Sequence, residues 1–147
     1  VEARIKTVNG EGFWPAFWML PSGGQWPCDG EIDIMEQWGN DWPTNETTGA
    51  AHIGSCPGQS FYQSYQYQSQ NGNYASDFHL YGIEWDENYI AWYVDGIKVY
   101  QVIQNISDLN MVKEKSLILL HGTTQRQRLL ILVLGHLIIR MKIVLLL

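Results

Sequence analysis

Residues 78–101 read "FHLYGIEWDENYIAWYVDGIKVYQ", and this stretch decides the fold class. It contains two or three short segments rich in aromatic and β-branched residues, separated by turn-forming residues at positions 86–88 and 95–96. Similar segments precede it, with turn signals about every 8 to 12 residues and no helical period. The pattern predicts an all-β sandwich or barrel.

The upstream sequence supplies further predicted strands. "VEARIKTV" (residues 1–8) alternates apolar and polar positions, as a half-buried strand does. "FWPAFWMLP" (residues 13–21) is an apolar run, and its early proline argues against a central position in a ladder at that point. "FYQSYQYQSQNGNYA" (residues 61–75) alternates Tyr with Gln and Ser, and its Asn71-Gly72 pair predicts a hairpin turn.

Composition limits the class of function. The chain of 147 residues is long enough for one domain with a sizeable core. Its formal net charge of −6 argues against a nucleic acid partner, because a phosphate backbone attracts a basic surface. Aromatic residues make up 13% of the chain and include seven Trp. This mixture suits a protein that lays rings against flat, uncharged, hydroxyl-rich ligands.

Cysteine usage and two sequons are compatible with export. Cys28 and Cys56 are the only cysteines, and their spacing matches neither a zinc site nor a redox pair. We expect one disulfide in a secreted protein, the alternative being two unpaired buried thiols. The sequons at Asn45 and Asn105 add little, and any targeting segment is expected to lie outside this sequence.

The composition changes abruptly in residues 116–147. All nineteen aromatic residues lie at or before Tyr100, and no acidic residue follows Glu114. A membrane anchor is one interpretation, but polar residues interrupt the apolar run of residues 129–147 and argue against it. The alternatives are an extra buried strand pair or helix, and a lost reading frame whose residues are foreign to the fold. We favour the lost frame and assign no function to this Leu/Ile-rich tail.

The sequence "GEIDIMEQWG" (residues 30–39) places three acids in one predicted strand. Glu31 and Asp33 share a face by alternation, whereas Glu36 points to the other face in a regular strand. One extra residue at positions 34–35, a β-bulge, brings all three acids to the same face. Like charges in such proximity repel, so at least one acid retains its proton.

Two carboxylates of unequal pKa are what glycoside cleavage requires. A retaining enzyme needs a nucleophile and an acid/base whose carboxyl groups are about 5 to 5.5 Å apart. In this scheme the side chains of Glu31 and Glu36 lean towards each other, and Asp33 between them assists. The alternatives for the acids alone are a solvated strand edge or an oxygen-rich cation loop.

Several segments together resemble glycoside hydrolase family 16, the laminarinase-like β-glucanases. "VEARIK", "WPAFWMLP", "WPCDGEIDIME" and "DFHLYGIEWDENYIAWYVDG" occur in the usual order of that family, over roughly residues 1–100. The resemblance implies a concanavalin A-like jelly-roll β-sandwich with the acidic strand on the concave face of a curved sheet. It also implies that Glu31 is the nucleophile, Asp33 the assisting acid and Glu36 the acid/base.

The resemblance extends to four substrate-binding candidates. Trp26 matches a cleft tryptophan that stacks against sugar, and Trp14 and Trp18 fall in a second aromatic segment that lines the cleft. His52 matches a family histidine near the acid/base. Read without the resemblance, Trp18 alternates into a hydrophobic stretch and is expected in the core, and Trp14 is as compatible with a structural role as with ligand binding. A lone histidine in an apolar strand, such as His52, is expected to be structural, and only the resemblance makes a role in ligand binding equally compatible.

The resemblance also indicates an incomplete domain. We expect residues 1–115 to be a partial family 16 catalytic domain, truncated at both ends, because the family has further strands before and after this region. The implied function is a secreted, retaining endo-β-glucanase acting on β-1,3 or mixed β-1,3-1,4 glucan through a covalent intermediate. The alternatives are a transglycosylase of the same family and a non-catalytic glucan-binding module. We expect a polysaccharide ligand, no nucleic acid, no membrane partner and no cofactor, and we assign the family's calcium ion to no residue here.

Overall fold

The computed structural model describes residues 1–21, 25–39, 43–55, 59–70, 72–86, 88–103, 115–123, 126–133 and 143–146. For residue 21, for residues 53–55 and 59–62, and for the strands beyond residue 103, the description covers the course of the backbone only. The regular elements within these ranges are all β-strands.

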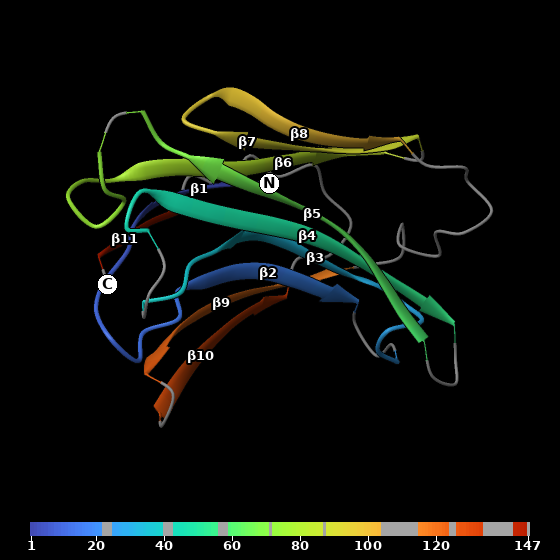
Figure 1. Cartoon of the computed structure of the whole chain (residues 1–147). Coiled ribbons are helices and arrows are strands. Elements are labelled where there is room, and N and C mark those ends of the chain that lie inside the picture. Colours follow the sequence, from blue (N-terminus) through green and yellow to red (C-terminus); the bar gives the residue numbers. More distant parts are fainter. Residues whose placement is uncertain are drawn as a thin grey trace.

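Two sheets form the layers of a sandwich (Figure 1). The five-stranded sheet has the order β11-β1-β6-β7-β8, in which β11 runs parallel to β1 and the other neighbours are antiparallel. Its strands are β1 (Glu2–Lys6), β6 (His79–Trp85), β7 (Tyr89–Val94), β8 (Ile97–Ile103) and β11 (Ile143–Leu146).

The six-stranded sheet is antiparallel throughout and has the order β10-β9-β2-β3-β4-β5. Its strands are β2 (Ala16–Pro21), β3 (Glu31–Glu36), β4 (Glu46–Ser55), β5 (Gln59–Gln68), β9 (Lys115–Thr123) and β10 (Arg126–Val133). The acidic segment is therefore a central strand, β3, with β2 and β4 as its neighbours. The prediction of an all-β sandwich is confirmed.

The core lies between the two sheets and follows from alternation along the strands. On β1, Ala3 and Ile5 are buried while the residues between and beside them are more exposed, as the pattern of "VEARIK" predicts. Trp92 on β7 is the largest fully buried side chain, and Trp85 packs against the same cluster. The core is made of Ala3, Ile5, Phe17, Met19, Ile32, Ile34, Met35, Ala51, Tyr65, Tyr74, Tyr81, Ile83, Ile90, Trp92 and Val94.

Two of the three turn signals coincide with hairpins, because the segments at residues 86–88 and 95–96 separate antiparallel neighbours, β6 from β7 and β7 from β8. Asp95 and Gly96 have φ angles of 50° and 79°, and they join β7 to β8. Positive φ at both central residues is the conformation that an Asp-Gly pair favours. The hairpin predicted around Asn71-Gly72 is wrong, because β5 pairs with β4 and β6 pairs with β1 and β7 in the other sheet. The chain there crosses between sheets.

The Leu/Ile-rich tail contributes three strands to the described backbone. β9 pairs with β2, β10 pairs with β9, and β11 lies beside β1. Of the alternatives for this segment, added strands agree with its backbone course. In the described part of the chain no helix has the length and apolar character needed to cross a bilayer. The lost reading frame and the domain boundary at residue 115 stay predictions.

Candidate active site

A β-bulge interrupts β3 at the predicted position. Asp33 pairs with Ala50 and Glu36 pairs with Thr48, so residues 34 and 35 together lie opposite Gly49. The register with β2 shifts at the same point. Both bulge residues, Ile34 and Met35, are 1% exposed and belong to the core. The extra residue therefore returns Glu36 to the face that carries Glu31 and Asp33.

Core side chains satisfy the carbonyl groups that the bulge removes from the ladder. The Trp92 indole nitrogen donates to the carbonyl oxygen of Asp33 at 2.8 Å, and the Tyr65 hydroxyl donates to the carbonyl oxygen of Ile34 at 3.4 Å. The Thr47 hydroxyl donates to the carbonyl oxygen of Glu36 at 3.2 Å. A buried carbonyl without a partner is costly, so these bonds stabilise the bulge. The sequence of the hairpin strands indicates only a packing role for Trp92, because its hydrogen bond reaches a carbonyl 59 residues away.

The three carboxylates project from the outer face of the six-stranded sheet. Asp33 is 3% exposed, whereas Glu31 and Glu36 are partly exposed. The facing strand confirms this orientation, because a side chain at Gly49 would point into Trp92 and Tyr65 in the core. Thr48 and Ala50, the neighbours of Gly49 along β4, therefore point to the outer face with the acids.

Two tryptophans hold the outer carboxylates by hydrogen bonds. The Trp26 indole nitrogen donates to Glu31 Oε2 at 2.6 Å, and the Trp14 indole nitrogen donates to Glu36 Oε1 at 3.1 Å. Both rings remain accessible, at 57% and 44% exposure. Sequence reasoning proposed these rings as sugar platforms and did not foresee the bonds, because each reaches a carboxylate from a segment outside β3.

His52 lies beside the inner carboxylate. It pairs with Glu31 across β3 and β4, and its Nε2 is 2.8 Å from Asp33 Oδ2. The resemblance placed this histidine near the acid/base; the register sets it directly opposite Glu31. The Trp26 ring is 6.4 Å from the His52 ring, so the two side chains flank Glu31 together.

Burial and like charge raise the pKa of both outer acids. The pKa of Glu31 is raised to about 7, first by burial and then by the charge of Asp33, while the Trp26 hydrogen bond opposes the rise. The pKa of Glu36 is also raised to about 7, by burial and by Asp33, with the Trp14 hydrogen bond opposing. The hydrogen bond to Asp33 is the main reason that the pKa of His52 is raised. The site thus holds protons near neutral pH, as a proton donor requires.

Two further aromatic residues lie near the acids. Trp18 pairs with Asp33 between the core residues Phe17 and Met19, so it is half-buried on the acidic face rather than part of the core. Trp38 stacks on Trp14, with ring centroids 6.3 Å apart and planes 25° apart. In the sequence Trp38 flanks a polar loop, which is compatible with a cleft wall, and its position two residues after Glu36 indicates a shared face.

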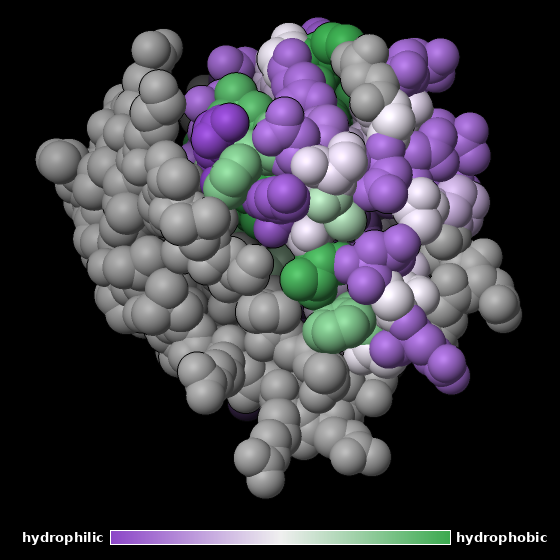
Figure 2. Space-filling view, turned by 90° about the vertical axis from the view of Figure 1, so that its left-hand side faces the viewer, coloured by the Kyte–Doolittle hydropathy of each residue, from purple (hydrophilic) through white to green (hydrophobic). Residues whose placement is uncertain are grey.

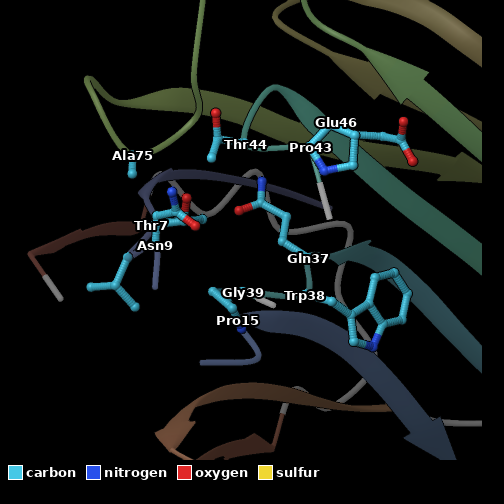
Figure 3. Close-up of a pocket in the computed structure, with 11 residues that line it drawn as sticks. Thr7, Asn9, Pro15, Gln37, Trp38, Gly39, Pro43, Thr44, Glu46 and Ala75 are labelled. Carbon is cyan, nitrogen blue, oxygen red and sulfur yellow. The ribbon is translucent and has the colours of Figure 1, made fainter. Parts of the chain in front are cut away.

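A small pocket lies where β3 ends and β4 begins (Figure 3). Gln37, Trp38, Pro43, Thr44 and Glu46 contribute to its lining. The surface seen in Figure 2 is mostly hydrophilic over the described residues, with small apolar areas between the polar ones. Thr7, Val8 and Asn9, which follow β1, and Ala75 also line it, so the pocket lies at the end of the sandwich, beside the Glu36 end of β3.

Two chemical expectations concern metal binding and a disulfide. The ligand atoms of Glu31, Asp33 and His52 lie within 4.8 Å of one another, which is close enough to hold one cation. Their hydrogen bonds to one another and to Trp26 give the same groups a role without a metal. The disulfide expected between Cys28 and Cys56 involves residue 56, which lies outside the described residues.

Comparison with known proteins gives consistent findings. The family model described as "Glycosyl hydrolases family 16" matches residues 1–116. Glucan endo-1,3-beta-glucosidase A1 of Niallia circulans is 36% identical over 118 residues, covering 69% of this chain and 15% of that protein. The beta-1,3-glucan-binding protein of Penaeus monodon is 37% identical over 106 residues, covering 66% of this chain and 29% of that protein.

Solved structures agree in fold. The structure described as "Bacteroides ovatus mixed linkage glucan PUL (MLGUL) GH16", in complex with a G4G4G3G product, is 30% identical to this chain. Its TM-score is 0.65, and the match covers 78% of this chain and 50% of that chain. An endo-beta-1,3-glucanase of Pyrococcus furiosus is 35% identical with a TM-score of 0.59, covering 74% and 45%. The chain therefore spans about half the length of these structures, and less of the curated relatives above.

Proposed function

Because the chain belongs to glycosyl hydrolase family 16, we propose that it is the catalytic part of a retaining endo-β-glucanase that cleaves β-1,3 or mixed β-1,3-1,4 glucan. The observation that carries the proposal is the bulge in β3, which gathers Glu31, Asp33 and Glu36 on one face. The named glucanases among the relatives support the substrate class.

The first step of the proposed reaction forms a glycosyl-enzyme. The Glu31 carboxylate attacks the anomeric carbon and forms an ester bond to it, while the bond from that carbon to the leaving oxygen breaks. Glu36 donates its proton to the leaving oxygen, so the departing sugar leaves as a neutral alcohol. Its raised pKa supplies this proton near neutral pH.

The second step releases the sugar and restores both acids. Glu36, now ionised, takes a proton from water, and the water oxygen attacks the anomeric carbon as its ester bond to Glu31 breaks. Two inversions retain the configuration. Asp33 and His52, 2.8 Å apart, serve as positioning residues, since the charge of Asp33 raises the pKa of both glutamates.

Hydrolysis of laminarin and of mixed-linkage β-glucan by the whole protein tests the proposal. Glu31→Gln and Glu36→Gln should each lower the rate at least about 100-fold, as loss of general acid–base or nucleophilic chemistry does. Glu84→Gln, an exposed acid on β6 in the other sheet, is the matched control and should keep the rate. Full activity in either active-site variant would refute the assignment. Chromatography of the products separates hydrolysis from transglycosylation.

Glucan recognition without cleavage is the second candidate function. It is favoured by the relative from Penaeus monodon, which is named a beta-1,3-glucan-binding protein. Retention of Glu31, Asp33 and Glu36 argues for the enzyme instead. A folded sample that binds laminarin, releases no reducing sugar and is unaffected by Glu31→Gln would establish the binding function.

We also propose that the protein is exported and that Cys28 and Cys56 form a disulfide. The two cysteines support the disulfide, because their spacing matches neither a zinc site nor a redox pair. Disulfides persist in oxidising compartments outside the cell, so the same observation supports export. Alkylation of the denatured protein with and without reductant tests the bond. Two thiols that react before reduction would contradict it.

A further inference from the structure

We propose that Gln66 and Gln68 on β5 form a binding subsite for the hydroxyl groups of glucan, at the Glu36 end of the acidic face, and that Glu46 holds both amides in position. The inference rests on the proposed function for the identity of the ligand. Its geometry is independent of any catalytic step.

The strand register places these residues on the face of the catalytic acids. Glu36 pairs with Thr48 across β3 and β4, and Thr48 pairs with Gln66 across β4 and β5. Directly paired residues share a face, so Gln66 lies in the row of Glu36, two strands or about 10 Å away. Glu46 and Gln68 are paired in the next row, beyond the end of β3.

Glu46 joins the two glutamines into one unit. Its carboxylate is a buried polar group, and it accepts a hydrogen bond from Gln66 Nε2 at 3.0 Å and from Gln68 Nε2 at 2.9 Å. A carboxylate that leaves water needs such donors, which accounts for the cluster as a stable arrangement. These bonds restrict the rotation of both amide groups.

The fixed amides still have hydrogen-bonding capacity. A glutamine amide offers two N–H donors and an oxygen with two acceptor positions, and Glu46 uses one donor of each. Both Gln66 and Gln68 are exposed. A sugar hydroxyl both donates and accepts, so an immobilised amide suits it better than a charged side chain does. Preorganisation reduces the entropy that binding costs.

A second observation marks the space between the acids and this unit. The hydroxyl oxygen of Thr48, between Glu36 and Gln66, is buried and has no hydrogen-bond partner among the described protein groups. Glu46 also borders the pocket of Figure 3 together with Trp38, whose ring stacks on Trp14 beside Glu36. Polar groups and rings thus continue from the acids to the glutamines.

The test measures binding separately from cleavage. Laminarin affinity is measured by affinity electrophoresis for Glu31→Gln protein alone, and with Gln66→Ala and Gln68→Ala added singly and together. We expect the double substitution to weaken binding about 5- to 30-fold and each single one about 3-fold, as the loss of one or two modest hydrogen bonds does. Gln63→Ala, an exposed glutamine on the other face of β5, is the matched control and should bind normally.

Kinetics of the active protein supply the second readout. The double variant should have a raised KM for laminarin with little change in kcat, because the subsite holds substrate and transition state equally. If the double variant does not fold, the single variants still test the inference, because each of them keeps one glutamine hydrogen bond to Glu46 between β4 and β5. Single and double variants equal to Gln63→Ala in affinity and KM would overturn the inference.

The outcomes for the two proposals are distinguishable. If the parent protein cleaves no glucan but the glutamine substitutions still weaken binding, catalysis is refuted and the subsite stands. If the parent cleaves laminarin and the glutamine variants match it, the subsite is refuted and catalysis stands. Absence of both binding and cleavage in the parent protein refutes both.

Discussion

Gly49→Ala should destabilise the protein and disturb the acids without touching them. A Cβ atom at this position would lie 2.5 Å from Tyr65 Cε1, 2.8 Å from the Asp33 carbonyl oxygen and 2.9 Å from Trp92 Cδ1. Real Cβ contacts do not approach so closely, and the crowded groups include the two rings that hold the bulge. Overpacking of this kind costs about 1–3 kcal/mol. A domain of this size loses about 2–4 °C of Tm per kcal/mol.

Urea unfolding followed by circular dichroism measures the stability change, and laminarin hydrolysis below the transition measures the functional one. Displacement of a reacting group by about 1 Å lowers rates about 100-fold, so activity should fall in protein that is still folded. Gly82→Ala on β6 is the matched control, because its Cβ would come no closer than 3.2 Å to any atom and lies in the other sheet. Stability within about 0.5 kcal/mol of the parent, with unchanged activity, would refute the role given to Gly49.

Three further predictions concern protons. Activity should fall as the pH rises through about 7, because Glu36 loses the proton that the leaving oxygen needs; the pH profile of kcat/KM measures this limb. Trp14→Phe removes a hydrogen bond that lowers the pKa of Glu36, so the same limb should move to higher pH, and an unmoved limb would contradict the assignment. Folding raises the pKa of Glu31 and Glu36 from 4.5 to about 7, so between these pH values the folded state binds protons that the unfolded state releases. The unfolding free energy should therefore decrease as the pH rises from about 4.5 to 7. Urea titrations measure this decrease, and Glu36→Gln should flatten it.

Local patterns predicted much of the fold because burial follows alternation. The period of two in "VEARIK" matches the buried face of β1. On β7, Ile90, Trp92 and Val94 alternate into the core, although Ala91 is buried as well. The bulge was predictable because only an extra residue lets Glu36 share a face with Glu31 while two apolar residues stay buried. These inferences need only neighbours along one strand.

Contacts between distant segments were beyond such patterns. The Asn71-Gly72 pair predicted a hairpin, but nothing local says whether the next strand pairs in the same sheet or crosses to the other. The bond from Trp14 to Glu36 spans 22 residues, and that from Trp92 to the Asp33 carbonyl spans 59. Trp18 was expected in the core because it lies within an apolar run. In β2, however, apolar residues occupy both faces of the sheet, and Trp18 lies on the face that carries the acids.

The hydrogen bonds to the two outer acids supply an argument for their different roles. Burial and the charge of Asp33 raise the pKa of Glu31 and Glu36 alike, so these forces do not choose which acid ionises first. The indole bond to Glu31 is 2.6 Å and that to Glu36 is 3.1 Å, and short bonds to a carboxylate favour its charged form. The charge of His52 lowers the pKa of both acids, so it does not by itself distinguish them. From the shorter indole bond we therefore expect Glu31 to ionise first, and its charge then raises the pKa of Glu36, as the roles proposed for the two acids require.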